Sequence, residues 1–257
     1  MTIAPFYKTK ESELYNCDNS RLLKQMESNS VNLIYCDILY GTGRNFGDYQ
    51  DLKAERKVIE EHYIPRILEM KRILKHNGSI FLQMDFKISH WIRIIMDEIF
   101  GYKNIRNEII WKYGLGRSSD KQFGKRHDNI YWYSNGENYT YNKQLEKSTS
   151  AMMGGAMKNM SDVWTDIPSL NNMAKERIGY ETQKNTELLK RIILASSNEG
   201  DLVADFYMGS GTTAEVALKN GRRFVGCDIG EKACLITEQR LEKYNKSNLL
   251  SEEKFDD

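Results

Sequence analysis

Two kinds of apolar pattern alternate along the first half of the chain. Continuous apolar runs at residues 31–36 and 79–84 predict buried strands, whereas apolar positions at helical spacing predict helices at residues 54–74 and 88–100. Strands that alternate with helices are typical of a sheet with mostly parallel strands and helices on both faces. The pattern therefore predicts an α/β fold built on a doubly wound, mostly parallel sheet.

Some positions within this pattern make the prediction more detailed. Pro65 lies inside the first helical segment and is expected to interrupt it, because proline lacks the N–H that a helix interior needs. The Asn-Gly pair at residues 77–78 is expected to end the same helix. In the second helix, Trp91, Ile94 and Ile95 are expected to be core residues.

The second half of the chain contains a strand, a tight turn and a helix around two glycines. An apolar run ends in Asp205, Gly209 and Gly211 follow, and residues 212–219 have helical spacing. Glycine lets the backbone approach a ligand closely, and the start of a helix offers unpaired N–H groups. The next strand ends in Asp228, where an acidic side chain suits the hydroxyls of a ribose. Glycines alone can simply turn a chain, but the two flanking aspartates favour half of a nucleoside-cofactor site.

The strand at residues 31–36 also carries polar groups at its end. It runs into Asp37-Ile-Leu-Tyr40, and a polar, glycine-spaced loop follows that is long enough to cover the end of the strand. In an open parallel sheet, ligands bind outside the carboxyl ends of the strands. We therefore expect Asp37 and Tyr40 to share one edge of the sheet with Asp205 and Asp228.

Residues 112–128 form a basic, glycine-containing segment with two aromatic residues, in which Asp120 is the acidic residue that precedes His127. The chain as a whole has a net charge of +1, so this concentration of positive charge favours contact with a nucleic-acid backbone over a merely solvated loop. The expected contacts are the basic residues Lys112, Arg117, Lys121, Lys125 and Arg126. His127 and Asp128 are adjacent on an extended segment and should point to opposite faces, so a structural role is expected rather than a catalytic pair.

Residues 137–175 are the least periodic part of the chain. A long loop inside a compact domain is usually functional, so we expect an insertion that touches the substrate, with a disordered tip around its Met-Gly patch as the alternative. The expected organisation is a first half at residues 1–136, an insertion at 137–177, a second half of the same domain at 178–245, and a charged, frayed tail at 246–257.

Composition sets the outer limits. A chain of 257 residues with 40% hydrophobic content can bury one substantial core. The four cysteines form no Cys-x-x-Cys pair and the histidines do not cluster, so neither a zinc site nor a disulfide framework is indicated. Reduced, buried thiols are the expectation for Cys36 and Cys227. The sequence has no signal peptide and no run of 18 apolar residues, so the cytoplasm is the expected location.

Three motifs together resemble one enzyme family. They are the tetrad Asp37-Ile-Leu-Tyr40, the segment Asp205-Phe-Tyr-Met-Gly-Ser-Gly-Thr-Thr213, and Thr182-Gln-Lys184. With the tetrad near the N-terminus and the glycine segment near the C-terminus, they resemble the amino-methylating DNA methyltransferases of the permuted β class, which methylate N6 of adenine or N4 of cytosine with S-adenosylmethionine. Further matches lie at residues 74–82, 107–112, 123–128 and 179–184, so that the resemblance covers nearly the whole chain.

The resemblance implies a Rossmann-like methyltransferase sheet with a small DNA-recognition insertion at residues 137–177. It implies that Asp37 and the main-chain carbonyl of Ile38 accept hydrogen bonds from the target amine, while Tyr40 stacks on a base flipped out of double-stranded DNA. The residues that it places at the cofactor are Asp37, Thr182, Lys184, Asp205, Tyr207, Gly209, Ser210, Gly211, Thr212, Thr213 and Asp228. It requires no metal, and it allows a homodimer and a cognate restriction endonuclease as partners.

The sequence departs from this family where prolines are usual. Ile38 and Leu39 replace both prolines of the tetrad, and Phe206 and Asn185 replace two others. Proline restricts φ, so its loss leaves the turn less pre-organised without removing the acceptors; activity is expected to survive, with a DNA-binding relative that has lost catalysis as the alternative. Because Asp37 heads the tetrad, where N4-cytosine members more often carry serine, adenine N6 is the expected target and cytosine N4 the alternative.

Overall fold

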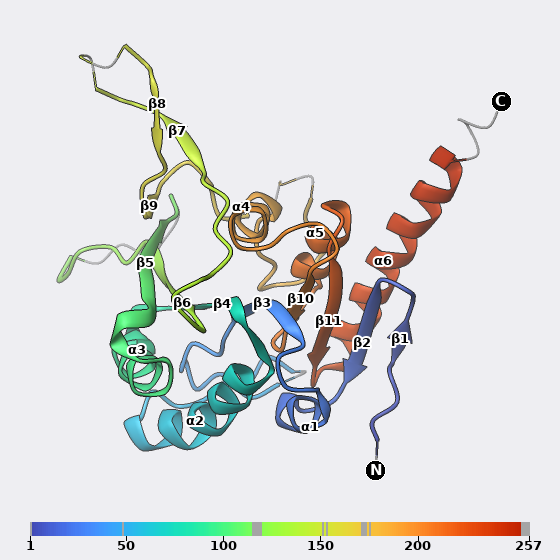
Figure 1. The fold of residues 1–257 in the computed structure, drawn as a ribbon. Helices are drawn as coiled ribbons and strands as arrows, with labels where there is room; N and C mark the ends of the chain where they lie inside the picture. The colour runs from blue at the N-terminus through green and yellow to red at the C-terminus, as the bar shows by residue number, and fades with distance from the viewer. Residues whose placement is uncertain are drawn as a thin grey trace.

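The computed structural model describes residues 2–47, 49–114, 120–150, 152, 154–170, 174 and 176–252, with the backbone alone at 246–252. Within these residues, nine strands form one sheet in the order β1-β2-β11-β10-β3-β4-β6-β5-β9, and β7 and β8 pair separately (Figure 1). Arg117, one of the expected nucleic-acid contacts, lies outside the described residues. The strands are β1 (Tyr7–Lys8), β2 (Ser12–Asn16), β3 (Val31–Asp37), β4 (Leu74–Met84), β5 (Ile105–Lys112), β6 (His127–Ser134), β7 (Leu145–Lys147), β8 (Met157–Asn159), β9 (Val163–Trp164), β10 (Leu202–Asp205) and β11 (Arg223–Asp228).

The sheet has a parallel centre and antiparallel additions. Strands β2, β11, β10, β3 and β4 are parallel to one another, whereas β1 pairs with β2, β4 with β6, and β6 with β5 in the antiparallel sense. The predicted doubly wound, mostly parallel α/β fold is therefore confirmed. Because the central strands are parallel, their carboxyl ends meet at one edge of the sheet, which is where a ligand site forms in folds of this kind.

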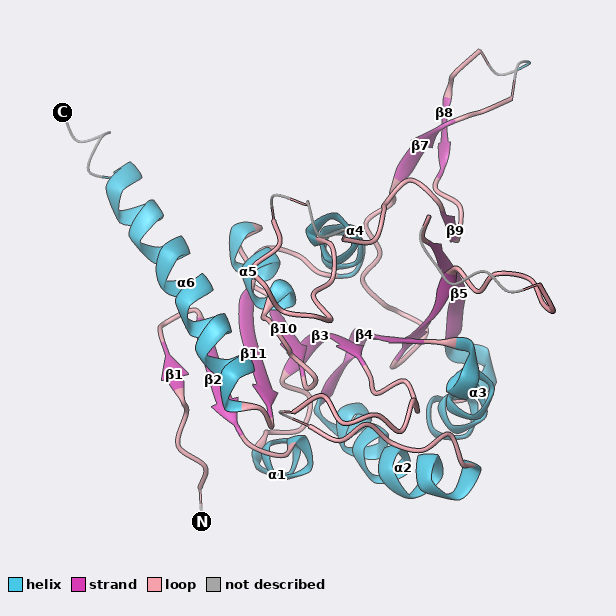
Figure 2. Ribbon diagram, turned by 180° about the vertical axis from the view of Figure 1, so that it is seen from behind, coloured by secondary structure: helices cyan, strands magenta, loops and turns pink. Residues whose placement is uncertain are grey.

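Helices cover both faces of the sheet (Figures 1 and 2). One hydrophobic core joins the sheet to α1 (Asn19–Gln25), α2 (Arg56–Ile73) and α3 (Phe86–Phe100). A second core joins the other face to α4 (Thr186–Ser196), α5 (Thr212–Lys219) and α6 (Glu231–Glu252). A 3₁₀ turn, η1 (Tyr102–Asn104), follows α3. In the described residues, no helix is long and apolar enough to cross a membrane.

Two expectations about the first long helix are wrong. Helix α2 runs from Arg56 to Ile73 through Pro65 without a break, since its buried face continues on both sides of the proline and outweighs one lost hydrogen bond. Residues 77–78 do not end this helix, because they already belong to β4. A Cβ on Gly78 would lie 2.8 Å from the backbone oxygen of Asn32, so the glycine permits a close approach of β4 to β3 where their register shifts.

Further expectations about the helices differ in outcome. In α3, Ile95 is buried and Trp91 packs half-buried against the core, but Ile94 is 47% exposed, so the prediction of a core residue is wrong there. Asp85 caps this helix by accepting a hydrogen bond from the Lys87 N–H. At the other end of the chain, α6 continues to Glu252, where a frayed tail was expected.

Short strands form within the insertion at residues 137–177. Strands β7 and β8 form an antiparallel ribbon that projects from the body of the protein, and β9 adds to the edge of the main sheet beside β5 (Figures 1 and 2). The base of the insertion is fastened to α4, because Asn142 donates to the carbonyls of Leu194 and Ser197 and Arg191 forms an ion pair with Asp166.

Candidate active site

A cavity of about 410 Å³ opens at the carboxyl ends of β3, β10 and β11. Its volume falls within the range of roughly 300–1,000 Å³ that is typical of small-molecule sites. Most of the residues expected at the catalytic and cofactor sites line it. They are Asp37, Ile38, Tyr40, Thr182, Lys184, Asp205, Tyr207, Gly209, Ser210, Thr212, Thr213 and Asp228.

The tetrad turn, residues 37–40, presents its two polar side chains to each other and to Lys184. The Tyr40 hydroxyl lies 2.7 Å from Oδ1 of Asp37, and Lys184 Nζ lies 2.6 Å from Oδ2. The Lys184 ammonium also lies 5.2 Å from the centre of the Tyr40 ring. Burial raises the pKa of Asp37, and the charge of Lys184 opposes that rise. The turn thus pairs a buried carboxyl group with a cation whose charge favours the ionised form of that group.

The glycine loop, residues 205–213, is organised by two aspartates. Asp205 accepts hydrogen bonds from the Tyr207 N–H at 3.0 Å and from the Thr213 hydroxyl at 2.6 Å. Asp228 accepts the Gly209 N–H at 2.9 Å, which ties the loop to the end of β11. Burial raises the pKa of Asp205 to about 7, and the nearby charges of Asp37 and Asp228 act in the same direction.

Gly211 does not line the cavity, although it was expected at the cofactor. It has φ +72° and precedes the first turn of α5, and a Cβ at this position would collide with the side chain of Thr237 in α6. Its absent side chain therefore allows α5 and α6 to pack closely, whereas Gly209, with φ +52°, keeps the backbone open at the cavity itself. Gly211 is therefore required for the packing of α5 against α6.

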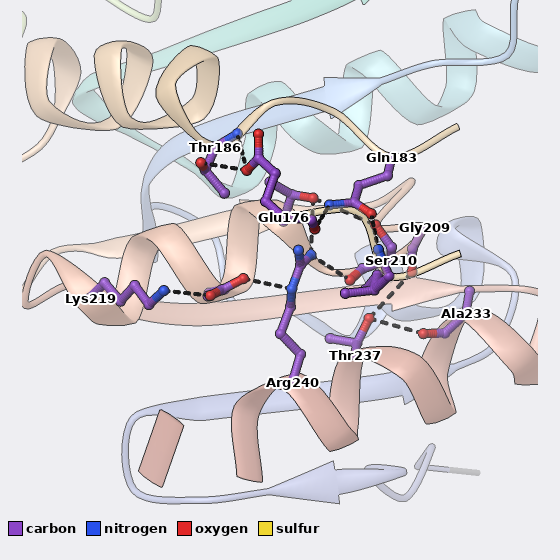
Figure 3. Close-up of polar contacts among 12 residues, drawn as sticks. Glu176, Gln183, Thr186, Gly209, Ser210, Lys219, Ala233, Thr237 and Arg240 are labelled. Carbon is purple, nitrogen blue, oxygen red and sulfur yellow. Dashed lines mark hydrogen bonds and ion pairs between the residues drawn. The ribbon is translucent and has the colours of Figure 1, made fainter. Parts of the chain in front are cut away.

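Helix α6 holds the outer side of the glycine loop (Figure 3). Arg240 donates to the Ser210 carbonyl at 2.9 Å and to the Thr212 hydroxyl at 3.0 Å, while its Nε pairs with Glu215 at 2.5 Å. The Thr237 hydroxyl lies 3.2 Å from the Gly209 carbonyl. Because Arg240 has little exposed surface, this ion pair and these hydrogen bonds fix the loop from behind.

The segment that carries Thr182 and Lys184 has its own internal support. Gln183 donates to the Glu176 carbonyl at 2.7 Å and accepts from the Ile178 N–H at 3.0 Å, and the Thr186 hydroxyl donates to the Glu176 carboxylate at 2.6 Å (Figure 3). Asn185 caps α4 by accepting the Glu187 N–H at 2.9 Å. Asparagine therefore begins this helix where the family usually has proline.

The loop after the tetrad forms part of the cavity wall. Buried Asp51 accepts the N–H groups of Gly41, Thr42 and Leu52, which closes residues 41–52 into a compact loop. Tyr49 lines the cavity and stacks on Phe46, with the ring centroids 5.0 Å apart. As expected, this loop covers the edge of the sheet beside the tetrad.

One end of the cavity was not foreseen from the sequence. Cys17, Asp18, Asn19, His62 and Arg66 line it. Arg66 joins the N-terminal part to α2, since it pairs with Asp18 at 2.9 Å and donates to Asn19 at 2.6 Å. Burial lowers the pKa of His62 to about 4, so this side chain is neutral at physiological pH. Asp18 follows β2, and it reaches the cavity because β2 lies parallel beside β11. No local sequence pattern reveals that pairing.

Asp128 was also missed. Its carboxylate is buried and lies 2.8 Å from the Tyr40 hydroxyl. His127 and Asp128 both belong to β6, which agrees with the expectation that their side chains point to opposite faces. The face that carries Asp128 borders the tetrad turn.

The four expected nucleic-acid contacts within the described residues, Lys112, Lys121, Lys125 and Arg126, do not line the cavity. Lys125 instead lies 3.8 Å from the centre of the Phe86 ring.

The residues present fit an adenosyl cofactor. Gly209 leaves the backbone open at the cavity, Asp228 offers a carboxylate at the end of a parallel strand, and Met208 and Ile229 supply apolar walls. A doubly wound sheet with this glycine loop and an acidic tetrad turn at one cavity defines the class of S-adenosylmethionine-dependent methyltransferases.

Comparison with known proteins identifies the family within that class. The model of the N6/N4 DNA methylase family matches residues 31–239, and the chain belongs to this family. It is 32% identical to the Type II methyltransferase M.HpaI of Haemophilus parainfluenzae over 88% of this chain and 73% of the relative. It is 31% identical to the DNA adenine methyltransferase YhdJ of Escherichia coli K12 over 86% of this chain and 79% of the relative.

Solved structures share the fold. The PvuII DNA methyltransferase, described as cytosine-N4-specific, superposes with a TM-score of 0.70 at 15% identity, covering 92% of this chain and 88% of that one. A putative DNA modification methylase of Thermus thermophilus, solved with S-adenosyl-L-methionine, gives 0.64 at 19% identity over 90% and 93%. The resemblance to amino-methylating DNA methyltransferases that use S-adenosylmethionine is thus confirmed at the level of the family.

Proposed function

We propose that this DNA methyltransferase transfers a methyl group from S-adenosylmethionine to the N6 amino group of an adenine flipped out of double-stranded DNA. The observation that carries the proposal is the carboxylate of Asp37 at the head of the tetrad, which Lys184 holds as an ion pair at 2.6 Å. An anionic acceptor suits an exocyclic amine that gains positive charge as it is methylated. The relative YhdJ, named as an adenine methyltransferase, supports the same choice of base.

The tetrad supplies acceptors and a stacking surface. The amine of adenine is a poor nucleophile because its lone pair is delocalised into the ring. Asp37 and the main-chain carbonyl of Ile38 accept its two hydrogens and favour the geometry in which the lone pair is available. The ring of Tyr40 replaces the stacking that the base loses when it leaves the duplex. When bound, the cofactor supplies an electrophilic methyl group on sulfonium.

The cofactor side of the proposal assigns each group by its position. Asp228 holds the ribose, the backbone at Gly209 and Ser210 lies against the cofactor, and Thr182 and Lys184 lie near its methionyl end. The positions of these groups around one cavity support this assignment. In this assignment Lys184 forms ion pairs with two anionic groups, the Asp37 carboxylate and the carboxylate of the cofactor.

The DNA side of the proposal rests on charge and shape. Lys112, Lys121, Lys125 and Arg126 contact phosphates, and the insertion at residues 137–177 contributes to sequence recognition. The projecting β7–β8 ribbon supports this role, because it extends beyond the body of the enzyme near the strand that ends in Lys112 (Figure 1). Neutralising these basic residues singly should weaken DNA binding without sequence preference and reduce its salt dependence.

Methylation with labelled cofactor tests the proposal directly. The enzyme is incubated with labelled S-adenosylmethionine and mixed-sequence DNA, and the DNA is digested to nucleosides. We expect label in N6-methyl-2′-deoxyadenosine; label in N4-methyl-2′-deoxycytidine supports the alternative base, for which the PvuII enzyme is named as specific. Binding of DNA without incorporated methyl groups identifies a relative that has lost catalysis.

An Asp37→Ala variant tests the tetrad. It should lose methyl transfer by at least about 100-fold, because one preorganised acceptor is removed from the transition state, while DNA binding is retained. Lys190→Met in α4, an exposed cation whose partner Glu187 lies 4.0 Å away, is a control that should leave the rate unchanged. Methylation at the normal rate by the Asp37 variant contradicts the assignment of residues 37–40.

The proposal extends to the biological setting. The relatives M.HpaI and M2.DpnII of Streptococcus pneumoniae are named as Type II methyltransferases, which supports a role in modification beside a cognate restriction endonuclease. Sequencing that detects methylated bases in cells expressing the protein identifies the base and the site together. Analytical ultracentrifugation with and without DNA tests for a homodimer.

A further inference from the structure

The Tyr40 hydroxyl lies between two carboxylates rather than beside one. It is 2.7 Å from Oδ1 of Asp37 and 2.8 Å from Oδ2 of Asp128, which reaches it from strand β6, 88 positions further along the chain. A phenol has one hydrogen to donate, so it serves one carboxylate at a time. Burial and both neighbouring charges raise the pKa of Tyr40, which keeps that hydrogen on the hydroxyl.

Asp128 is built as an acceptor. Besides Tyr40, its carboxylate accepts the Gln83 side-chain amide at 2.8 Å and the Tyr113 hydroxyl at 3.2 Å. Gln83 is itself fixed, because its Oε1 accepts the Tyr35 hydroxyl at 2.7 Å. The Asp128 side chain is 3% exposed, so these donors replace the water that it has lost.

We propose that Asp128 is a positioning residue of the methyl-transfer site: it accepts the hydrogen bond that the Tyr40 hydroxyl donates, holds that ring in place for the target base, and leaves Asp37 free to accept hydrogen bonds from the target amine. This inference rests on the proposed function, since it assigns the work of residues 37–40. It also accounts for a tetrad turn without prolines. Because no proline restricts the backbone of residues 37–40, the Asp128 side chain from β6 fixes the Tyr40 ring instead.

The second carboxylate has an electrostatic consequence for Asp37. The charges around Asp37 are Lys184 before α4, Asp128 on β6 and Asp205 on β10, and the neighbouring phenols are Tyr40, Tyr35 on β3 and Tyr49 in the covering loop. Lys184 lowers the pKa of Asp37 and the charge of Asp128 raises it. Removing the charge of Asp128 should therefore lower the pKa of Asp37, so that the ionised acceptor persists to lower pH.

Three substitutions separate orientation from charge. Asp128→Asn retains an oxygen that can accept the Tyr40 hydrogen but loses the charge; it should shift the acid limb of the kcat profile to lower pH by about one unit. Asp128→Ala loses both functions and should lower kcat by about 10- to 100-fold at the optimum pH, because the stacking ring is no longer held. Tyr40→Phe keeps the ring without the hydroxyl, so adding Asp128→Ala to it should cost little more.

The chain offers a matched control. The Tyr133 hydroxyl donates to Asp97 at 2.5 Å, a second tyrosine–aspartate pair that includes a residue of β6 and does not line the cavity. Asp97→Asn should leave the kcat profile and the fluorescence of bound DNA as in the wild type. The DNA carries 2-aminopurine at the target position, and its fluorescence should report a less stacked flipped base in Asp128→Ala but not in Asp97→Asn.

A carbon-13 NMR titration of the Asp37 carboxyl gives a readout that needs no activity. Protein labelled at aspartate Cγ is titrated with and without Asp128→Asn, and the Asp37 signal is assigned by its loss in Asp37→Asn. A lower midpoint in Asp128→Asn supports the inference even if the wild-type enzyme methylates no DNA, an outcome that would overturn the proposed function alone. An active wild type in which Asp128→Asn moves neither the Asp37 midpoint nor the acid limb, and Asp128→Ala retains full kcat, overturns the inference.

Discussion

The glycine loop and the tetrad turn lie at the ends of neighbouring parallel strands, yet they keep their shapes in different ways. The glycine loop depends first on its own residues, because Gly209 and Gly211 have positive φ and α5 begins directly after them; Asp228 and Arg240 then hold it from outside. The tetrad turn, residues 37–40, contains neither glycine nor proline. Its polar side chains are held from a distance, by Asp128 on β6 and by Lys184 before α4.

This difference decides how each region tolerates change. A loop that needs glycines at positive φ is destabilised when one of them acquires a side chain, because the strain arises within the loop itself. A turn held by distant partners can lose its usual prolines and still present Asp37 and Tyr40, provided that those partners stay. The comparison predicts effects on stability for the loop and effects on protonation and rate for the turn.

The largest effect is expected from Gly211→Ala in the glycine loop. The new Cβ would collide with the Thr237 side chain, and the residue has φ +72°, so overpacking and left-handed strain together should destabilise the fold by about 4 kcal/mol. Urea denaturation measures the change. Gly209→Ala is the control, since its Cβ would meet Tyr180 only at 3.4 Å and should cost about 1–2 kcal/mol. Partial recovery in Gly211→Ala with Thr237→Ala confirms the packing cause; equal losses at both glycines contradict it.

A pH effect on stability is expected next, from Asp205. Its pKa of about 7 in the folded protein exceeds the ordinary value of 3.8, so between these values folded Asp205 holds a proton that the unfolded chain has lost. The free energy of unfolding should therefore fall as the pH rises through this window, by up to about 4 kcal/mol. Denaturation at a series of pH values, compared with Asp205→Asn, isolates this contribution. Parallel pH curves for the two proteins would rule it out.

For the tetrad turn, the sharpest test is Lys184→Met. Its charge and hydrogen bond lower the pKa of Asp37, so their loss should raise that pKa and move the acid limb of kcat to higher pH by about one unit or more. The shift is opposite to the one expected for Asp128→Asn. The profile is measured at saturating cofactor, because Lys184 also lines the cofactor cavity. Shifts of the same sign in both variants would mean that Asp37 does not control the limb.

The smallest effect is expected from Asn185, which stands where the family usually has proline. Asn185→Ala removes the cap on the Glu187 N–H and a hydrogen bond to the Pro168 carbonyl, and should destabilise the fold by about 1 kcal/mol. Asn185→Pro suits the backbone, which has φ −69°, but loses the same cap. It should therefore be no more stable than wild type in thermal denaturation. A clear gain in melting temperature would show that the cap is unimportant here.

Much of the fold could be predicted because its signals are local. Helix α5 has the predicted bounds, 212–219, and Ile95 of α3 is buried as predicted. The errors arose where tertiary contacts outweighed a local preference. Packing carries α2 through Pro65, and the approach of β4 to β3 uses a glycine that seemed to end a helix. Ile94 follows the helical period of the apolar residues, but its side chain is exposed to solvent and lies outside the core.

The sequence by itself determined the strand–turn–helix around the glycines, the acidic strand ends and the motif order that identifies the family. These features depend on hydrophobic periodicity and on φ angles that individual residues allow, which act within a few positions of the chain. The tertiary structure alone decided that β6 lies beside β4 and brings Asp128 to Tyr40, and that β2 brings Asp18 to the wall of the cavity. Strand order depends on how whole elements pack, so no local pattern could report it.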